Sequence, residues 1–302
     1  MKHSFKNTIN NYTSETDKVR KLEGEELTRL QDCLLEMLLD VLDVCRDHDI
    51  TVMLAHGSAL GAIRHQGFIP WDDDIDLMMP REDYSRFVDC FKGVFGEKYS
   101  LVAPNNGENY QTRFPKIMKK NTVLQSVFDV GSDLMTGIFI DIFIIENVPS
   151  NKLIRILKGI HSNILMLIGS RVYIYEHYNN VLKDFMSGSI ESRLSLSSAR
   201  IVGKVFSFAP SRKWSDWIDK SVRYKKETGL VGLPTGRKHY FGEIFQKQCL
   251  LPPVNGIFKG KQVPLPADID QYLSNLYGDY MTIPPKEKQE SHYIVELIFE
   301  KN

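Results

Sequence analysis

Cysteine is scarce in this chain of 302 residues, which contains only Cys33, Cys45, Cys90 and Cys249. Their separations match no zinc-ligand spacing, and Cys33 and Cys45 fall on one apolar helical stripe. We therefore expect packed thiols, as in a reducing cytosol, and predict no structural zinc. The pattern argues against a small secreted domain held together by disulfides.

The first residues lack the apolar core of a signal peptide, and we identify no run of about 18 apolar residues that would span a bilayer. A cytoplasmic location is therefore expected. Lys plus Arg and Asp plus Glu both number 38, so the net charge is zero. No basic stripe with interleaved aromatics is present, and we expect no nucleic-acid partner. With 42% hydrophobic residues, the chain can bury a substantial core in one or two domains.

Charge is nevertheless unevenly distributed along the chain. Residues 151–240 contain 16 Lys and Arg against 6 Asp and Glu, a local excess of +10. Within this segment, residues 152–171 are predicted to be helical, with cations beside apolar runs. Such a helix could lie on an anionic membrane surface. A solvated helical subdomain whose basic side keeps it soluble explains the pattern equally well.

A glycine turn precedes the most informative part of the sequence. Residues 51–55 are strand-like, and a helix is predicted to begin at Gly57 and Ser58. Backbone N–H groups at a helix start, together with the helix dipole, favour a phosphate group. Gly57 and Ser58 are therefore predicted to bind phosphate.

Four carboxylates follow within five positions: Asp72, Asp73, Asp74 and Asp76. A strand is predicted over residues 74–77, in which Asp74 and Asp76 share one face, roughly 6 to 7 Å apart, while Ile75 and Leu77 enter the core. Paired carboxylates suit Mg²⁺ or Mn²⁺. Repulsion within the cluster also favours a bound cation. Asp72 either shares the metal face by alternation or forms the turn before the strand.

A later apolar run carries a single charge. Residues 137–145 are predicted to form a strand buried on both faces, interrupted only by Asp141. A buried carboxylate needs a partner, which is either a metal or substrate, or a core arginine. Because Asp74 and Asp76 are present, we interpret Asp141 as the third acid of a phosphoryl or nucleotidyl transfer centre. Its role as metal ligand or as proton acceptor stays open.

These motifs resemble the nucleotidyltransferase superfamily and, more narrowly, the LicD family. The main match is the run from His56 to Pro80, HGSALGAIRHQGFIPWDDDIDLMMP. It continues in Arg81–Tyr84 (REDY), Phe114–Ile117 (FPKI), Asp141–Phe143 (DIF) and Tyr277–Pro285 (YGDYMTIPP). The resemblance therefore brackets most of the chain.

The resemblance implies an α/β (α+β) fold with a nucleotidyltransferase-like mixed sheet flanked by helices. It implies transfer of a phospho-alcohol, most often phosphocholine from CDP-choline, to a sugar hydroxyl of a cell-surface glycan or its lipid-linked precursor, with release of CMP. Asp74 and Asp76 would then hold Mg²⁺ or Mn²⁺, while Gly57 and Ser58 hold the phosphates. The fukutins, eukaryotic relatives, handle ribitol phosphate. Fukutin-related members carry zinc, for which this chain shows no ligand spacing.

Other residues near the motif are assigned more loosely. Arg64 and Lys116 are predicted to bind phosphate. Candidate substrate contacts are His65, Trp71 and Asp73. For His65 a surface loop, and for Trp71 packing in the core, are the simpler interpretations. His292 is too isolated in the sequence to assign.

We predict four segments along the chain: a frayed arm (1–22), a catalytic core (23–150), a basic helical subdomain (151–240) and a C-terminal segment that completes the acceptor side (241–302). A helix is predicted over residues 25–48 and another over 80–91. Predicted short strands near 99–103, 114–118 and 122–128 fill out a mixed sheet that ends at the Asp141 strand. Turns and hairpins over 229–266 and a helix over 268–277 complete the prediction.

Two other reactions use similar residues. Nucleotidyl transfer from an NTP would release pyrophosphate, and a glycosyltransferase with an Asp-x-Asp metal site would release a nucleoside diphosphate. Gly57 and Ser58 lie only 16 to 19 residues before the Asp74/Asp76 pair, and Asp141 is remote. Both features argue against the glycosyltransferase. A non-catalytic nucleotide-binding domain is less favoured because all three acids persist.

Overall fold

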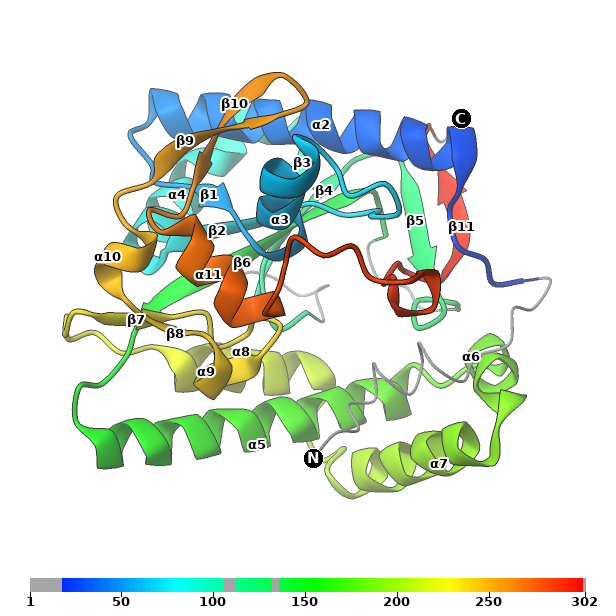
Figure 1. Ribbon diagram of the computed structural model, residues 1–302. Helices are drawn as coiled ribbons and strands as arrows, with labels where there is room; N and C mark the ends of the chain where they lie inside the picture. Colours follow the sequence, from blue (N-terminus) through cyan, green and yellow to red (C-terminus); the bar gives the residue numbers. More distant parts are fainter. Residues whose placement is uncertain (1–17, 106–111, 132–135, 301–302) are drawn as a thin grey trace.

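The computed structural model describes residues 18–105, 112–131 and 136–300. A mixed β-sheet lies at its centre, with helices on both sides (Figure 1). This arrangement confirms the predicted α/β (α+β) class.

The described helices are α2 (Gly24–Asp47), α3 (His56–His65), α4 (Arg81–Phe95), α5 (Lys152–Glu176), α6 (Asn180–Phe185), α7 (Ile190–Val205), α8 (Ser211–Val222), α9 (His239–Gly242), α10 (Lys247–Leu250) and α11 (Ile269–Tyr277), with 3-10 turns at Met186–Gly188 and Lys286–Lys288. The described strands are β1 (Met53–Leu54), β2 (Asp76–Pro80), β3 (Tyr99–Val102), β4 (Lys116–Lys119), β5 (Val123–Ser126), β6 (Phe139–Asn147), β7 (Leu230–Gly232), β8 (Ile244–Gln246), β9 (Val254–Phe258), β10 (Lys261–Leu265) and β11 (Ile294–Ile298).

The main sheet has the order β1-β2-β6-β4-β3, and β7 and β8 extend it beyond the end of β6. The β2–β6 pair is parallel, whereas the other pairs are antiparallel. The prediction that the sheet ends at the Asp141 strand is wrong, because β6 pairs with β2 on one side and β4 on the other. Its near-continuous apolar sequence suits this central position, where both faces are covered.

Strand β5 was predicted to join this sheet, and that prediction is also wrong. It pairs with β11 in a separate two-stranded sheet. Only Val123 of its four residues is buried, and the other three are partly exposed. A strand with so little apolar surface suits a peripheral ribbon better than the centre of a sheet.

Helix α2 confirms the prediction for residues 25–48 to within one residue at each end. Leu27, Leu30, Leu34, Leu38 and Val41 recur at intervals of three and four, and all are buried. This spacing places them on one side of the helix, which covers the sheet. Helix α4 likewise follows Pro80, as predicted, and extends to Phe95.

The N-terminal arm differs from its prediction over residues 18–22. Val19 and Leu22 are buried, and the backbone of Arg20 forms a bridge with Ile294 near the other end of the chain. The prediction of a frayed arm is therefore wrong here, because these apolar side chains find distant partners. Residues 1–17 lie outside the described residues.

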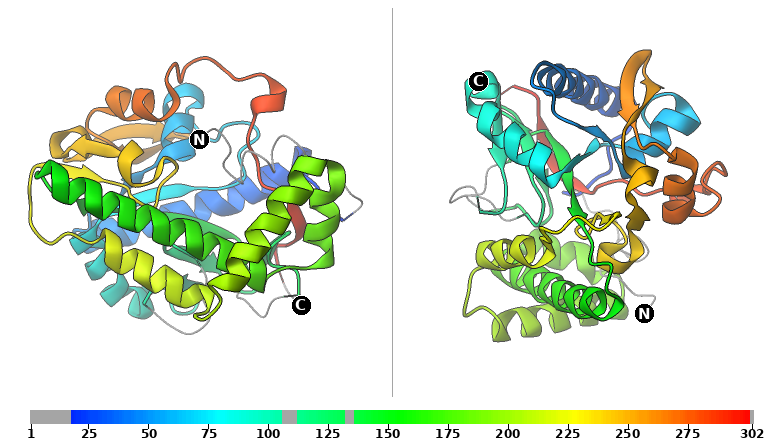
Figure 2. Two further views of the ribbon diagram at one scale, coloured as in Figure 1. Left: turned by 90° about the horizontal axis from the view of Figure 1, so that it is seen from below. Right: turned by 90° about the vertical axis from the view of Figure 1, so that its left-hand side faces the viewer.

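Helices α5, α7 and α8 form a layer on the opposite side of the sheet from α2 (Figure 2). Helix α5 is long and apolar enough to cross a membrane by length and composition alone. The expectation that no segment is apolar enough to span a bilayer is therefore wrong for α5, by length and composition. Only 22% of its most apolar stretch is buried, so α5 differs from an ordinary core helix.

The C-terminal part confirms the predicted turns, hairpins and last helix. Strands β9 and β10 form a hairpin, and α11 begins after Asp268, whose carboxylate accepts a hydrogen bond from the Gln271 N–H. Capping of this kind satisfies a backbone donor that a helix start leaves unpaired. Strand β7 lies within the predicted basic segment but pairs with β6 of the central sheet.

Candidate active site

Two of the three predicted acids lie side by side. Asp76 is the first residue of β2, and it pairs in register with Asp141 on the parallel neighbour β6. Neighbouring strands are about 4.8 Å apart. The side chains of Asp76 and Asp141 are 13% and 11% exposed, so both acids are largely removed from water. Ile75 and Leu77 are fully buried, as the predicted alternation requires.

Asp74 differs from its prediction because β2 begins only at Asp76. The alternation argument that placed Asp74 and Asp76 on one strand face is therefore wrong. Instead, an Asp74 carboxylate oxygen lies 3.8 Å from Nδ1 of His292. Asp74 thus belongs to the loop before the strand.

Asp73 and His292 hold this loop. The Asp73 carboxylate accepts a hydrogen bond from the His292 N–H at 3.1 Å and lies 2.8 Å from the ring Nδ1. Burial raises the pKa of Asp73, but His292 outweighs this effect, and the net pKa is below the ordinary value. Within the described residues, Asp73, Asp74 and His292 are the one group of three ligating side chains whose atoms lie within 4.8 Å of one another.

Asp72 confirms the turn interpretation, since its N–H donates to the Ile69 carbonyl at 2.9 Å. Its carboxylate reaches the start of α3. A Cβ atom added to Gly57 would lie 2.8 Å from Asp72 Oδ2, which shows how closely this carboxylate approaches the helix start. Negative charge is favoured at a helix N-terminus. The helix start predicted to bind phosphate therefore already faces a carboxylate.

Ser58 connects α3 to the paired acids. The helix begins at His56, one residue before the predicted start at Gly57, and the buried Ser58 Oγ accepts a hydrogen bond from the Asp76 N–H at 2.9 Å. A hydroxyl group that accepts in this way keeps its own proton for donation. Gly57, Ser58, Asp72 and Asp76 are thus neighbours in space, as their motif predicted.

His56 and Glu243 form a buried pair that the sequence analysis did not identify. His56 Nε2 lies 3.0 Å from Glu243 Oε2, and His56 Nδ1 lies 3.7 Å from Asp76 Oδ2. Burial lowers the pKa of His56, but Glu243 and Asp76 outweigh it and raise the pKa above 6.5. Glu243 is 187 residues from His56. Its only sequence signal was the Phe-Gly-Glu-Ile-Phe stretch, which we interpreted as a turn.

The backbone at His56 is strained. Its φ angle is +39°, in the left-handed region that non-glycine residues rarely adopt. The His56 N–H donates to the hydroxyl of Tyr272 on α11 at 3.1 Å. Such strain persists only where the surroundings hold it, and it concentrates at functional sites.

Lys116 is the protein partner of Asp141. Its Nζ lies 2.5 Å from Asp141 Oδ1 and 3.4 Å from the centre of the Phe139 ring. The sequence analysis left open whether a core cation pairs with Asp141; one does, and it is the lysine predicted to bind phosphate rather than an arginine. Burial lowers the pKa of the nearby Arg113, and this effect outweighs the opposite effects of Asp141 and Glu243.

Arg64, His65 and Trp71 contact other parts of the protein. Arg64 Nη1 donates to the Tyr280 carbonyl at 2.8 Å, and its Nε donates to His65 Nε2 at 3.0 Å. His65 lies edge-on to Trp71, which packs against the core as the simpler interpretation held. Phosphate contact by Arg64 and substrate contact by His65 stay predictions.

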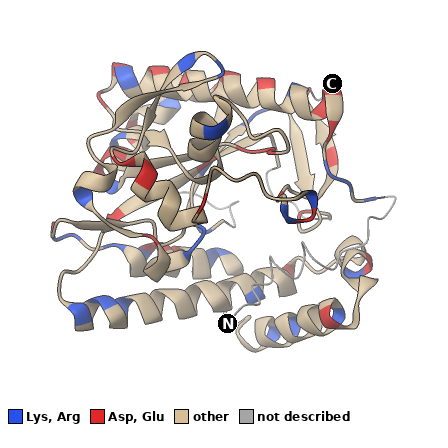
Figure 3. Ribbon diagram, viewed as in Figure 1, with Lys and Arg blue, Asp and Glu red and all other residues tan. Residues whose placement is uncertain are grey.

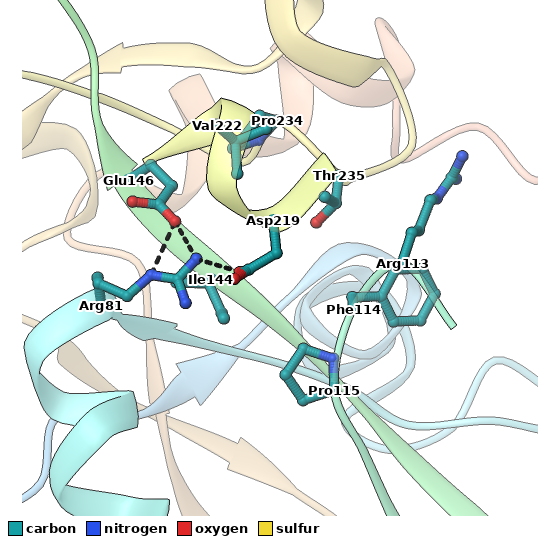
Figure 4. Close-up of a pocket in the computed structure, with 10 residues that line it drawn as sticks. All are labelled: Arg81, Arg113, Phe114, Pro115, Ile144, Glu146, Asp219, Val222, Pro234 and Thr235. Carbon is teal, nitrogen blue, oxygen red and sulfur yellow. Dashed lines mark hydrogen bonds and ion pairs between the residues drawn. The ribbon is translucent and has the colours of Figure 1, made fainter. Parts of the chain in front are cut away.

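A small pocket of mixed polar and apolar lining lies between the sheet and the helical layer (Figure 4). It is lined by Arg81, Arg113, Phe114, Pro115, Ile144, Glu146, Asp219, Val222, Pro234 and Thr235. Arg81 bridges Glu146 on β6 and Asp219 on α8. Burial raises the pKa of Glu146 despite the nearby guanidinium. The bridge ties α8 to the sheet, so we assign it a structural role.

The chain is similar in sequence to known proteins. Residues 49–154 match the family model described as the LicD/FKTN/FKRP nucleotidyltransferase domain. Over 276 residues the chain is 28% identical to the lipopolysaccharide cholinephosphotransferase LicD of Haemophilus influenzae, covering 85% of this chain and 94% of that protein. An uncharacterized protein of Rickettsia typhi is 37% identical over 54 residues, 18% of each chain.

Proposed function

This chain carries a LicD-family nucleotidyltransferase domain over residues 49–154, and on that premise we propose that it is a phosphotransferase acting on a cell-surface glycan. It moves a phospho-alcohol, with phosphocholine the first candidate, from a CDP-alcohol to a sugar hydroxyl of the glycan or its lipid-linked precursor. CMP is the product that leaves. The near full-length similarity to a lipopolysaccharide cholinephosphotransferase supports the reaction class.

The observation that carries this proposal is the register pair of Asp76 and Asp141 beside the start of α3. Two buried carboxylates next to a helix N-terminus form a charged, water-poor site in which electrostatic effects are strong. The pair lies within the matched domain. A site built only for structural stability would gain little from placing two acids side by side in the core.

The donor set fits a hard divalent cation. Asp76 and Asp141 present carboxylate oxygens, Asp74 lies two residues before β2, and Asp72 lies at the start of α3. Lys116 contacts one oxygen of Asp141, and a carboxylate has two oxygens that can accept or ligate. We propose that Asp74, Asp76 and Asp141, with Asp72 as a further ligand, hold Mg²⁺ or Mn²⁺. When bound, such an ion would supply positive charge against a pyrophosphate and the departing CMP.

The chain's own residues supply the rest of the mechanism. An acceptor hydroxyl oxygen bonds to the distal phosphorus, the bond from that phosphorus to the bridging oxygen breaks, and CMP departs with the electron pair. Lys116 contacts one oxygen of Asp141 and so orients the carboxylate, which accepts the proton of the hydroxyl. In this proposal Asp72 serves the cation instead of the start of α3, Gly57 and Ser58 hold phosphate oxygens, and Arg64 and Lys116 balance their charge.

Glu243 and His56 act on the acids indirectly. Glu243 fixes one nitrogen of the His56 ring, so the other nitrogen faces Asp76. A carboxylate behind a histidine sets the orientation of the ring and its protonation. Because Glu243 and Asp76 raise the pKa of His56, protonation of the ring is favoured, and the protonated ring balances the negative charge of Asp76. We regard both residues as positioning groups.

Product analysis tests the reaction class. The full chain is incubated with Mg²⁺, CDP-choline and a sugar acceptor, and the nucleotide released is identified. CMP together with a phosphocholine-bearing sugar supports the proposal. From matched incubations, pyrophosphate released from an NTP would identify a nucleotidyltransferase, and a nucleoside diphosphate released from a nucleotide sugar would identify a glycosyltransferase.

Calorimetry then identifies the donor. CDP-choline, CDP-ribitol and CDP-glycerol are titrated separately with and without Mg²⁺. Tight binding of CDP-choline that requires the cation supports the phosphocholine assignment. Preference for CDP-ribitol would replace phosphocholine with ribitol phosphate and leave the reaction class unchanged.

A further inference from the structure

Helix α5 presents an apolar stripe to solvent. Its exposed residues, 47% to 65% accessible, are Leu153, Leu157, Ile160, Ile164 and Leu167. Their spacing alternates between four and three residues, so they share one side of the helix. The stripe is about 21 Å long, from the helical rise of about 1.5 Å per residue. Single exposed apolar residues are common on proteins, but a continuous row of this length marks a contact surface.

The other side of α5 is already packed. Gly169 lies against Trp214 and Ile218 of α8, and Gly159 lies against the rings of Tyr240 and Phe241. Any added Cβ at Gly159 would meet the Phe241 ring at 2.3 Å. The protein itself therefore fixes the orientation of the helix and leaves the apolar stripe outward.

Helix α7 adds a second apolar row next to the first. Its members, 65% to 69% accessible, are Ile190, Leu194, Ile201 and Val205. The two helices touch where Gly203 packs against the backbone of Arg171. Both lie on the same side of the molecule, away from α2 (Figure 2). The two rows are therefore neighbours on one layer.

Positive charge accompanies both rows. Exposed Lys152, Arg193 and Lys204 lie directly beside the apolar residues Leu153, Leu194 and Val205 in the chain. Figure 3 shows Lys and Arg on all three helices of the layer. Helices α5 and α7 together carry seven Lys and Arg against two Asp and Glu, which is half of the excess of +10 over residues 151–240. Apolar residues that insert and cations that remain at the surface are the combination that anionic membranes bind.

We propose that the α5–α7 face docks on an anionic lipid surface, with α5 lying in the plane of the membrane rather than crossing it. Packing of one side of α5 against α8 and α9 opposes a spanning orientation, because that side would have to leave the protein. The basic excess favours lipid over a second copy of this face, since two such faces would repel each other.

A short series of contacts connects the docking face to the candidate site. Phe241 packs on Gly159 of α5, and Glu243, two residues later, contacts His56 beside Asp76. This link rests on the proposed function, because it would bring a lipid-linked acceptor close to the acids. Membrane docking itself does not require that function.

Vesicle flotation of the full chain tests docking without any turnover. We compare vesicles of phosphatidylcholine alone with vesicles in which about a third of the lipid is phosphatidylglycerol. Recovery with the anionic vesicles should be about tenfold higher and should fall as salt increases. Equal recovery with both vesicles, or none with either, overturns the proposal.

Variants separate docking from folding. Leu157→Glu combined with Ile164→Glu should reduce recovery about tenfold. Val94→Glu on α4 is the matched control, since Val94 is 47% exposed and Ile164 is 49% exposed. It should float like wild type. An equal loss of vesicle recovery in the Val94→Glu control contradicts membrane docking. A wild-type protein that does not float but forms a dimer, which the double variant dissociates, contradicts it as well.

The same assay separates this proposal from the proposed function. Asp76→Asn should float like wild type because Asp76 lies in the sheet and not on the docking face. Active enzyme that never floats would overturn docking and leave the transferase standing. Flotation of a protein that releases no CMP from CDP-choline would support docking and contradict the proposed phosphocholine transfer.

Discussion

The acidic site and the α5–α7 face depart from ordinary protein anatomy in opposite ways. At the site, Asp73, Asp141 and Glu243 are buried, and each has a charged or titratable partner. On the α5–α7 face, large apolar residues are exposed. Proteins rarely bury acids or expose rows of leucine and isoleucine without a reason. The first departure indicates chemistry, and the second indicates a partner.

The contrast predicts that a conservative change at the acids will affect turnover far more than stability. Asp76→Asn should lower turnover at least about a thousandfold, because the site loses charge where the transition state forms. Its melting temperature should stay near or above that of wild type, since crowded negative charge is relieved. Steady-state kinetics and calorimetry measure the two effects. Asp43→Asn, at an exposed position on α2, should change neither. A large drop in the melting temperature of Asp76→Asn would show that the acid is structural.

A smaller effect is expected one contact further from the acids. Glu243→Gln should lower turnover about 10- to 100-fold, as for other residues that orient a histidine. It should also lower the pKa of His56, which Glu243 and Asp76 raise above 6.5. NMR titration of His56 measures this shift. An unchanged His56 titration would contradict the positioning role, and Glu227→Gln at an exposed site should leave it unchanged.

The sign of the linked stability effect follows from the raised pKa of His56. The protonated ring stabilises the folded state fully below the unfolded pKa, near 6.5, and this contribution is lost as pH rises through the higher folded pKa. In Glu243→Gln the folded pKa falls, so the advantage at low pH should shrink. Melting temperatures of both proteins from pH 5 to 8 test this difference.

Packing between α5 and α7 should respond to volume rather than charge. Gly203→Ala places a Cβ 2.2 Å from the Arg171 carbonyl oxygen, so backbone must move. We expect a loss of about 1–3 kcal/mol in unfolding free energy, as in other overpacked sites, with normal turnover per folded molecule on a soluble acceptor. Gly93→Ala on α4 has open space and is the control. Denaturant unfolding with equal losses in both variants would contradict the packing account.

The smallest effect is expected for Leu157→Glu combined with Ile164→Glu. Both positions are exposed, so the unfolding free energy should change by less than about 0.5 kcal/mol per site. Turnover on a soluble acceptor should equal that of wild type, while turnover on a vesicle-bound acceptor falls. If the double variant keeps the wild-type rate on the vesicle-bound acceptor too, the docking face does not contribute to catalysis.

The sequence predicted the elements around the site well because their signals are local. A stripe of leucines identified α2, and the apolar run around Asp141 identified β6. The spacing from Gly57 to Asp76 correctly placed a helix start beside an acid. Periodicity and turn chemistry act over a few residues, so a single sequence contains them.

The errors concern contacts between distant residues. His292 holds Asp73 from 219 residues away, and Glu243 reaches His56 from 187 residues away. Neither residue stands in a periodic pattern, so no local signal could identify its partner. Asp74 was misplaced because the His292 contact, rather than strand alternation, sets its loop.

Phosphorus NMR of the reaction with Mg²⁺, CDP-choline and a glycan acceptor tests the central claim most directly when wild type is compared with Asp76→Asn. The account predicts that wild type forms CMP and a new phosphodiester on the sugar in equal amounts, and that Asp76→Asn, folded to the same degree, forms neither. Phosphodiester formation at the wild-type rate by Asp76→Asn would contradict it.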